Sequence, residues 1–162
     1  MALFESNVPS SFLEEERSMF GEFLDPLPGP YFVVEDSAGH PVGCGGLASR
    51  DVEEATLCWG MVDFQKHKEG VGRVLLRVRL AVAARIPSIA RVGMNTSNET
   101  APFFEREGLR TVKVTENYFR PGLHRHDMVC ELDATRRAEI EARLAAMLAQ
   151  GHSLESGVLT VG

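Results

Sequence analysis

The stretch WGMVDFQKHKEGVGRVLLRVRLAVAAR, residues 59–85, decides the fold that the sequence indicates. It begins with the end of an apolar, β-branched strand and passes into a loop that carries Gly70 and Gly72. Apolar residues then recur at helical spacing, which predicts a long amphipathic helix. A helix that opens after a glycine turn presents free backbone N–H groups at the positive end of its dipole. The stretch therefore favours a site for a phosphate or pyrophosphate.

Two common phosphate-binding loops do not fit this glycine spacing. The Walker pattern requires Lys and then Ser or Thr after its last glycine, where this sequence has Arg73 and Val74. The dinucleotide fingerprint requires a third glycine at the position of Leu75. The loop alone leaves two interpretations open: an ordinary strand-to-helix turn, or another class of phosphate loop.

Length and composition indicate one globular domain over residues 1–162. The 162 residues are enough for a sizeable core, and 44% hydrophobic and 25% charged residues are ordinary for such a domain. A net charge of −6 argues against nucleic acid as the main partner, since duplex binding usually requires a basic surface. No stretch approaches transmembrane length, so we expect no membrane partner.

The cysteines and the start of the chain indicate the compartment. Cys44, Cys58 and Cys130 all lie in expected strands and form no C-x-x-C pair. We expect them to be small buried residues in a reducing environment. No charged start followed by an apolar run marks a signal peptide, so we expect a cytoplasmic protein.

The order of predicted elements is that of a mixed α+β domain. A capping-box pattern at Ser11-x-x-Glu14 predicts the start of the first helix, and Pro26 follows its end. The expected strands are 3–7, 31–35, 41–48, 55–62, 90–95, 109–115 and 124–132, with a loop at 117–123. The expected helices are 12–24, the long helix after Gly72, a short helix over 100–107, and a terminal helix from Asp133 or Thr135 to Gly151.

Three segments in this order resemble the motifs of the GNAT family of N-acetyltransferases. They are WGMVDFQKHKEGVG, NTSNETAPFFEREGL and NYFRPGLHRHDMVCEL, and the resemblance covers about residues 10–133. A terminal helix and tail, residues 134–162, complete the chain. The resemblance implies a mixed, mostly antiparallel central sheet with splayed strands, flanked by helices.

The resemblance also implies acetyl-CoA as cosubstrate. Pantetheine would lie between the strand ending at Val62 and the strand ending at Asn95, and the glycine loop would hold the pyrophosphate through its N–H groups. The residues expected to bind the cofactor are Met61, Val62, Asp63, His67, Lys68, Glu69, Gly70, Val71, Gly72, Arg73, Asn95, Ser97, Asn98, Phe103 and Phe104.

Two residues depart from the family pattern. His67 stands where Gln or Arg is commoner, and Phe104 stands where the family often has a Tyr that acts as general acid. A phenyl ring cannot donate a proton, although a thiol with a pKa of about 8.5 leaves reasonably well without an acid. Ser97 and Asn98 fit either cofactor binding or helix capping.

The candidate catalytic residues are Glu54, Tyr118 and His124. Glu54 and His124 are the leading candidates for the base that takes the amine proton, and Tyr118 for a donor to the thiolate. The alternatives are a solvated surface carboxylate and a half-buried packing tyrosine. His124 and His126 share one strand face, but the sequence offers no further nearby ligands, so we expect no metal site.

The expected function is transfer of an acetyl group from acetyl-CoA to a primary amine of a small molecule. Two alternatives stay open: a non-catalytic acyl-CoA-binding module, and a protein N-terminal or lysine acetyltransferase. A homodimer is a further possibility, through the terminal helix.

Overall fold

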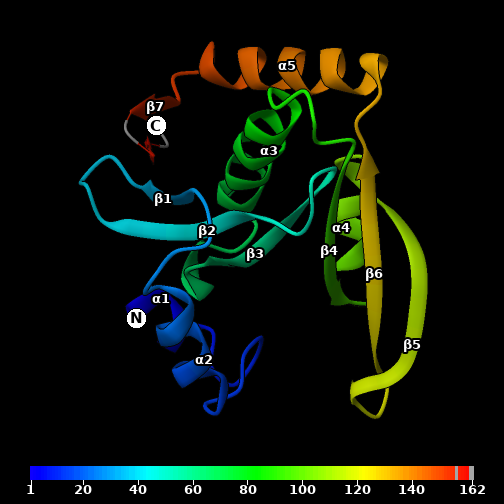
Figure 1. Ribbon diagram of the computed structural model, residues 1–162. Helices are drawn as coiled ribbons and strands as arrows, with labels where there is room; N and C mark the ends of the chain where they lie inside the picture. Colours follow the sequence, from blue (N-terminus) through cyan, green and yellow to red (C-terminus); the bar gives the residue numbers. More distant parts are fainter. Residues whose placement is uncertain (156, 161–162) are drawn as a thin grey trace.

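The computed structural model describes residues 1–155 and 157–160. Their strands form one mixed sheet in the order β5-β6-β4-β3-β2-β1-β8-β7. Helices cover both faces: α3 lies on one side of the central strands, and α1 and α2 lie on the other (Figure 1). The helices are α1 (Ala2–Ser6), α2 (Glu16–Phe23), α3 (Val71–Ala84), α4 (Ala101–Arg106) and α5 (Ala134–Leu148), with the 3₁₀ turn η1 (Phe64–Lys66). The strands are β1 (Tyr31–Glu35), β2 (Pro41–Ser49), β3 (Glu54–Val62), β4 (Arg91–Ser97), β5 (Arg110–Arg120), β6 (Leu123–Glu131), β7 (Ser153–Glu155) and β8 (Val158–Thr160).

The N-terminal region differs from the sequence prediction. The expected strand over residues 3–7 is wrong, because residues 2–6 form α1 and bury Phe4 in an aromatic cluster with Phe12 and Phe20. The predicted capping box is also wrong. The carboxylate of Glu16 accepts the Leu13 N–H at 2.8 Å, and α2 begins at Glu16 instead of residue 12.

The meander of β1, β2 and β3 agrees with the predicted strands to within one residue at each end. Its register shifts between β2 and β3, where Cys44 pairs with Met61 but Gly46 pairs with Cys58. Strand β3 therefore carries one extra residue there, which forms a β-bulge. Within this bulge Trp59 adopts a left-handed backbone with φ of 43°.

Strands β3 and β4 pair over only part of their length. They are parallel neighbours at Glu54–Arg91, Ala55–Val92 and Thr56–Gly93, and no pair follows. Both strands continue, β3 to Val62 and β4 to Ser97, while β4 stays paired with β6 along its whole length. The expected splay is therefore confirmed, and it begins after Thr56 (Figure 1).

Helix α3 carries the main core. Its buried residues pack on the central strands, and α5 packs across α3 through Ile140, Leu144 and Met147. The side chain of Asp133 caps α5 by accepting the Arg136 N–H at 2.8 Å, as one of the two predicted caps. The apolar stripe of the terminal helix is thus used inside the domain.

Strand β5 extends further than predicted. The expected loop over 117–123 is wrong at both ends, because residues 117–120 belong to β5 and Leu123 belongs to β6. A register shift between Thr115 and Arg120, with Asn117 at φ of 54°, lets the hairpin continue through a stretch that reads as a loop.

The tail docks on the sheet. Strand β8 pairs in parallel with β1, and β7 pairs with β8, so residues 153–155 and 158–160 extend the sheet beyond β1. Cys44 and Cys130 are buried as expected, Cys58 is half-buried, and all three are free thiols. None of the helices described is long and apolar enough to cross a membrane.

Candidate functional site

The glycine loop connects β3 to α3 through two left-handed residues. Asp63 starts it by capping η1, with its Oδ1 accepting the Gln65 N–H at 2.9 Å. The chain then passes Lys68, with φ of 70°, and Gly70, with φ of 94°, and the helix begins at Val71. A left-handed backbone is easy for glycine and costly for other residues, so Gly70 is required by the turn.

Backbone N–H groups converge at the start of α3. Of the six residues expected to hold a pyrophosphate, Glu69 and Arg73 donate to carbonyl oxygens of Lys66 and Gly70. Within the described part of the chain, the N–H groups of the other four have no acceptor: Lys68, Gly70, Val71 and Gly72. The loop thus offers a cluster of free donors at the positive end of α3.

The charges around this loop are unevenly paired. Arg73 and Arg77 contact Glu107 at 3.2 and 2.9 Å, and Arg143 approaches the same carboxylate at 3.7 Å. The Glu107 side chain is only 7% exposed, so this group is a buried ion-pair network. Lys68 is exposed and makes no ion pair with any residue described in the structure, which leaves its ammonium available to an anion.

The open edge of β3 is partly occupied. The carbonyl of Val62 accepts hydrogen bonds from Asn7 Nδ2 at 2.8 Å and from His67 Nε2 at 3.1 Å. The Asp63 N–H donates to Val42 on β2 at 2.9 Å, and the Met61 side chain is buried beneath α1 and α2. A carbonyl has two lone pairs, so a ligand that needs Val62 oxygen must displace one of these donors.

The opposite wall is formed by β4 and α4. Ser97 Oγ lies 3.3 Å from Thr100 Oγ1, and Asn98 ties β4 to the β5–β6 hairpin through His124 N–H at 2.8 Å and Gly122 O at 3.4 Å. These contacts do not cap α4, whose N-cap residue is Thr100 and makes no side-chain capping hydrogen bond, so the helix-capping alternative is wrong and cofactor binding by Ser97 and Asn98 stays a prediction. The rings of Phe103 and Phe104 meet edge to face at 4.9 Å and pack on the core. Phe103 also lies beside Gly72, so α4 borders the glycine loop.

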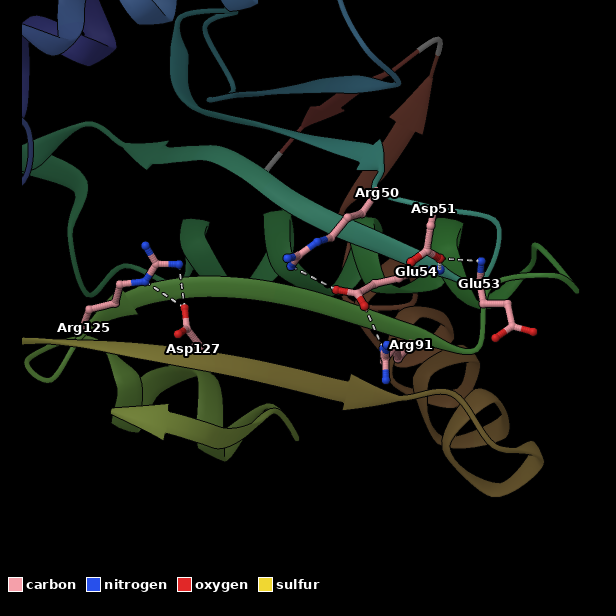
Figure 2. Close-up of polar contacts among 7 residues, drawn as sticks. All are labelled: Arg50, Asp51, Glu53, Glu54, Arg91, Arg125 and Asp127. Atoms are coloured by element: carbon pink, nitrogen blue, oxygen red, sulfur yellow. Dashed lines mark hydrogen bonds and ion pairs between the residues drawn. The ribbon is translucent and has the colours of Figure 1, made fainter. Parts of the chain in front are cut away.

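Glu54 lies where the gap between β3 and β4 begins. Its side chain is 10% exposed, and its oxygens accept hydrogen bonds from Arg91 at 2.8 Å and Arg50 at 3.3 Å (Figure 2). The Asp51 carboxylate fixes the start of the strand by accepting the N–H groups of Glu53 and Glu54, each at 2.8 Å. Glu54 also fills the space at Gly93, where an added Cβ would lie 2.8 Å from its Oε1.

Tyr118 and His124 lie at the other end of β4. Tyr118 is 55% exposed. The Arg125 guanidinium lies over the Tyr118 ring, 5.0 Å from the ring centre. His124 Nδ1 accepts the Asn117 N–H at 2.9 Å, which holds the hairpin. Glu54 lies beside Arg91 at one end of β4, and His124 lies beside Asn98 at the other end. Arg91 and Asn98 are seven residues apart, which is roughly 23 Å along a strand. The structure therefore does not bring the three candidate catalytic residues together.

The sequence analysis missed Asp127. It lies on β6 directly opposite Asn95, and the alternation along β4 places both on the sheet face that carries Glu54. Its Oδ1 accepts the Arg125 Nε at 2.8 Å (Figure 2). The closing motif contains this Asp, but only strand pairing places it near the gap. His126 contacts Thr111 at 3.1 Å. Among the described residues, no three His, Cys, Asp or Glu side chains gather to hold a metal ion.

No protein-family model and no curated protein matches this chain. Solved structures do match it. A GNAT family acetyltransferase from Elizabethkingia anophelis with acetyl-CoA bound has a TM-score of 0.61 at 16% identity, covering 74% of this chain and 85% of that one. The chain has the GNAT fold.

Two further GNAT-like structures cover more of the chain. Ard1 from Thermoplasma volcanium has a TM-score of 0.66 at 16% identity, over 81% of this chain and 87% of its own. An aminoglycoside 6′-N-acetyltransferase complexed with coenzyme A has a TM-score of 0.62 at 13% identity, over the same shares of the two chains. At these identities the likeness establishes the GNAT fold, and the chemistry has to be argued from this chain's own residues.

Proposed function

We propose that this protein transfers an acetyl group from acetyl-CoA to a primary amine of a small molecule. One observation carries the proposal: the splay of β3 and β4 opens beside four unused N–H donors at the start of α3. An extended arm of amides fits a pair of open strand edges, and a diphosphate fits a helix N-terminus. Coenzyme A is one molecule that contains both, and acetyl-CoA, when bound, supplies an acetyl thioester already activated for attack.

The glycine loop would hold the diphosphate. The N–H groups of Lys68, Gly70, Val71 and Gly72 are its donors, and the free ammonium of Lys68 adds charge next to them. Gly72 lies between Val62 and Phe103, each about as close as an ordinary packing contact. Because no side chain projects from Gly72, the phosphates can approach the backbone there.

Glu54 is our proposed base for the amine proton. It is the only one of the three predicted catalytic residues at the point where the strands part. The two arginines on its oxygens keep it in place, and Asp127 adds a second carboxylate to the same sheet face, which suits a cationic amine. Tyr118 and His124, at the far end of the β5–β6 hairpin, would contact the acceptor or shape its pocket.

One observation favours a second candidate, an acyl-CoA-binding module without catalysis. Phe104 packs against Phe103 and the core, so it offers no proton donor at the position where related enzymes often have a tyrosine. Such a module would bind the cofactor and transfer nothing. Acetylation of a protein N-terminus or lysine stays a third interpretation of the same site.

Calorimetry with coenzyme A and acetyl-CoA tests the binding half of the proposal. Gly72→Asp places a negative charge at the first turn of α3, which the helix dipole tolerates but a diphosphate does not. We expect at least a tenfold weaker affinity for Gly72→Asp and a much smaller change for the control Gly72→Ala. Equal affinity of both variants, or no binding by the wild-type protein at millimolar cofactor, would refute the proposal.

A turnover assay distinguishes the proposed transferase from a non-catalytic acyl-CoA-binding module. Acetyl-CoA and a panel of small amines are incubated with the protein, and release of free thiol is followed. Amine-dependent release above the protein-free control supports the transferase. Tight cofactor binding with no release on the whole panel would favour the module.

A further inference from the structure

Arg79 is a buried cation that the proposed function does not yet use. It lies on the sheet-facing side of α3, and the residue is only 4% exposed. Its guanidinium has five N–H donors, and two hydrogen bonds are present: Nε to Leu75 O at 3.2 Å and Nη1 to Gly46 O at 3.5 Å. No carboxylate of the described residues forms an ion pair with it.

Two glycines make room for this guanidinium behind the β-bulge. A Cβ added at Gly45 would lie 2.9 Å from Arg79 Nη1, and one added at Gly60 would lie 3.0 Å from the same atom. Gly60 belongs to the bulge, where β3 has its extra residue. The charge is therefore placed directly behind the backbone of β3, with only a glycine between it and the other side of the strand.

This charge is uncompensated at neutral pH. Burial lowers the pKa of Arg79 to about 10, so the group stays protonated at pH 7. The titratable groups nearest to it are Tyr31 on β1, Cys44 on β2 and Cys58 on β3, and burial raises the pKa of each. All three are neutral at pH 7, and a buried charge without a partner is costly. The arrangement suits an anion that arrives during the reaction.

The reacting end of the proposed cofactor would lie next to Gly60. Gly60 is exposed, although the guanidinium behind it is not. An extended pantetheine arm is roughly as long as four to five residues of strand, so an arm that enters beside Phe64, just past the end of β3, reaches Gly60 in the bulge. Resting on the proposed function, we propose that the Arg79 guanidinium stabilises the coenzyme A thiolate that leaves when the acetyl group is transferred.

The step balances without a general acid. The amine nitrogen forms a bond to the acetyl carbon, the carbon–sulfur bond breaks, and the sulfur keeps the electron pair as thiolate. The amine proton is taken up by solvent water and passes through it to Glu54, which lies six residues along β3 from Gly60, and water later protonates the sulfur. Arg79 acts through its field across Gly60 and touches no reacting atom, so it is a positioning charge. It supplies the stabilisation that a tyrosine at position 104 would give in related enzymes.

The test measures the thiol of bound coenzyme A, which requires no acceptor amine. Thiolate absorbance in the ultraviolet is followed against pH with saturating coenzyme A. We expect the bound thiol to have a pKa about one unit below the free value of roughly 8.5, which is a tenfold larger ionisation constant. Arg79→Met should return it to the free value, and Arg79→Lys should keep most of the shift. Arg85→Met, which removes an exposed charge from the same helix, should leave it unchanged.

The outcomes are distinguishable from failure of the proposed function. If calorimetry detects no coenzyme A binding, the proposed function fails before this test begins. If coenzyme A binds and the wild-type protein leaves its thiol pKa at the free value, the inference about Arg79 is wrong while the binding site stands. An unchanged shift in folded Arg79→Met also overturns it. If Arg79→Met does not fold, Arg79→Gln, which keeps hydrogen-bond donors and removes the charge, takes its place, and an unchanged shift there overturns the inference.

Discussion

Two buried charged side chains lie at helix α3, Glu107 packed against it and Arg79 on it, and among the described residues only Glu107 has oppositely charged partners. Glu107 packs against the outer side of α3 and is surrounded by Arg73, Arg77 and Arg143. Arg79, on the inner side, is as deeply buried and has no carboxylate partner among the residues described. A buried charge that is paired with opposite charges can serve a structural role. A buried charge without a partner destabilises the fold, so we expect it to be kept for a function. We therefore interpret Glu107 as structural and Arg79 as functional.

Glu54 is the strongest test of this comparison. Like Glu107 it forms ion pairs with arginines, and yet we propose that it acts as the base. Glu54→Gln keeps its size and cannot accept the amine proton. We expect kcat/KM in the thiol-release assay to fall by roughly 100-fold with little change in coenzyme A affinity. Glu53→Gln, the exposed neighbour, is the matched control. If the Glu54→Gln variant keeps its activity and loses only stability, Glu54 is a structural residue like Glu107 and is not the base.

Glu107→Ala tests the structural side of the comparison. It removes the carboxylate that three arginines share, but those arginines are 25–56% exposed and can turn to water. We expect a loss of about 2–3 kcal/mol in the free energy of unfolding by urea, below the largest values for buried pairs. Glu107→Gln should lose less, because it still accepts hydrogen bonds. A loss under about 0.5 kcal/mol would show that the network contributes nothing.

Arg79→Met should change stability in the opposite direction. The replacement fills similar volume and removes the cost of a desolvated charge, so we expect a gain of about 1–2 kcal/mol at pH 7. Urea unfolding of the protein without cofactor measures it. A loss of more than about 1 kcal/mol would mean that the guanidinium holds the bulge together, and the contrast with Glu107 would disappear.

Arg85→Ala gives the smallest effect and sets the baseline for an exposed pair on the same helix. Arg85 and Glu141 are 58% and 42% exposed at 2.7 Å, so we expect at most about 0.5 kcal/mol at pH 7. The hydrogen bond from Arg85 lowers the pKa of Glu141, so the pair stabilises the fold above the unfolded pKa and is lost as pH falls through the folded one. The difference between variant and wild type should begin to shrink below about pH 4.3, the ordinary value for a glutamate, and vanish only below the lowered pKa of the folded state.

The backbone part of the site follows from the sequence. Apolar and β-branched runs between turns predicted β1, β2 and β3 almost to the residue, and the pair Gly70 and Gly72 placed the start of α3. These features depend on local preferences, which a sequence expresses directly. The resemblance to GNAT motifs added the splay, which the structure confirms.

The charged part of the site does not follow from the sequence. Arg79 sits within an apolar helical stripe, and its burial depends on Gly45 and Gly60, which lie far from it in the chain. Asp127 gains its place from pairing with β4, and Glu54 gains its arginine from β4 as well. Such contacts are set by the packing of distant segments, so they become visible only once the strands are in register.

The pairing of β8 with β1 has a consequence for the order of folding. Val33 on β1 pairs with Val158 on β8, so β1 cannot complete its pairing until a segment about 125 residues later has been synthesised. Until that segment emerges, the edge of β1 is open and able to pair with another chain. The nascent protein is therefore most prone to aggregation just before β8 arrives to cover the edge of β1.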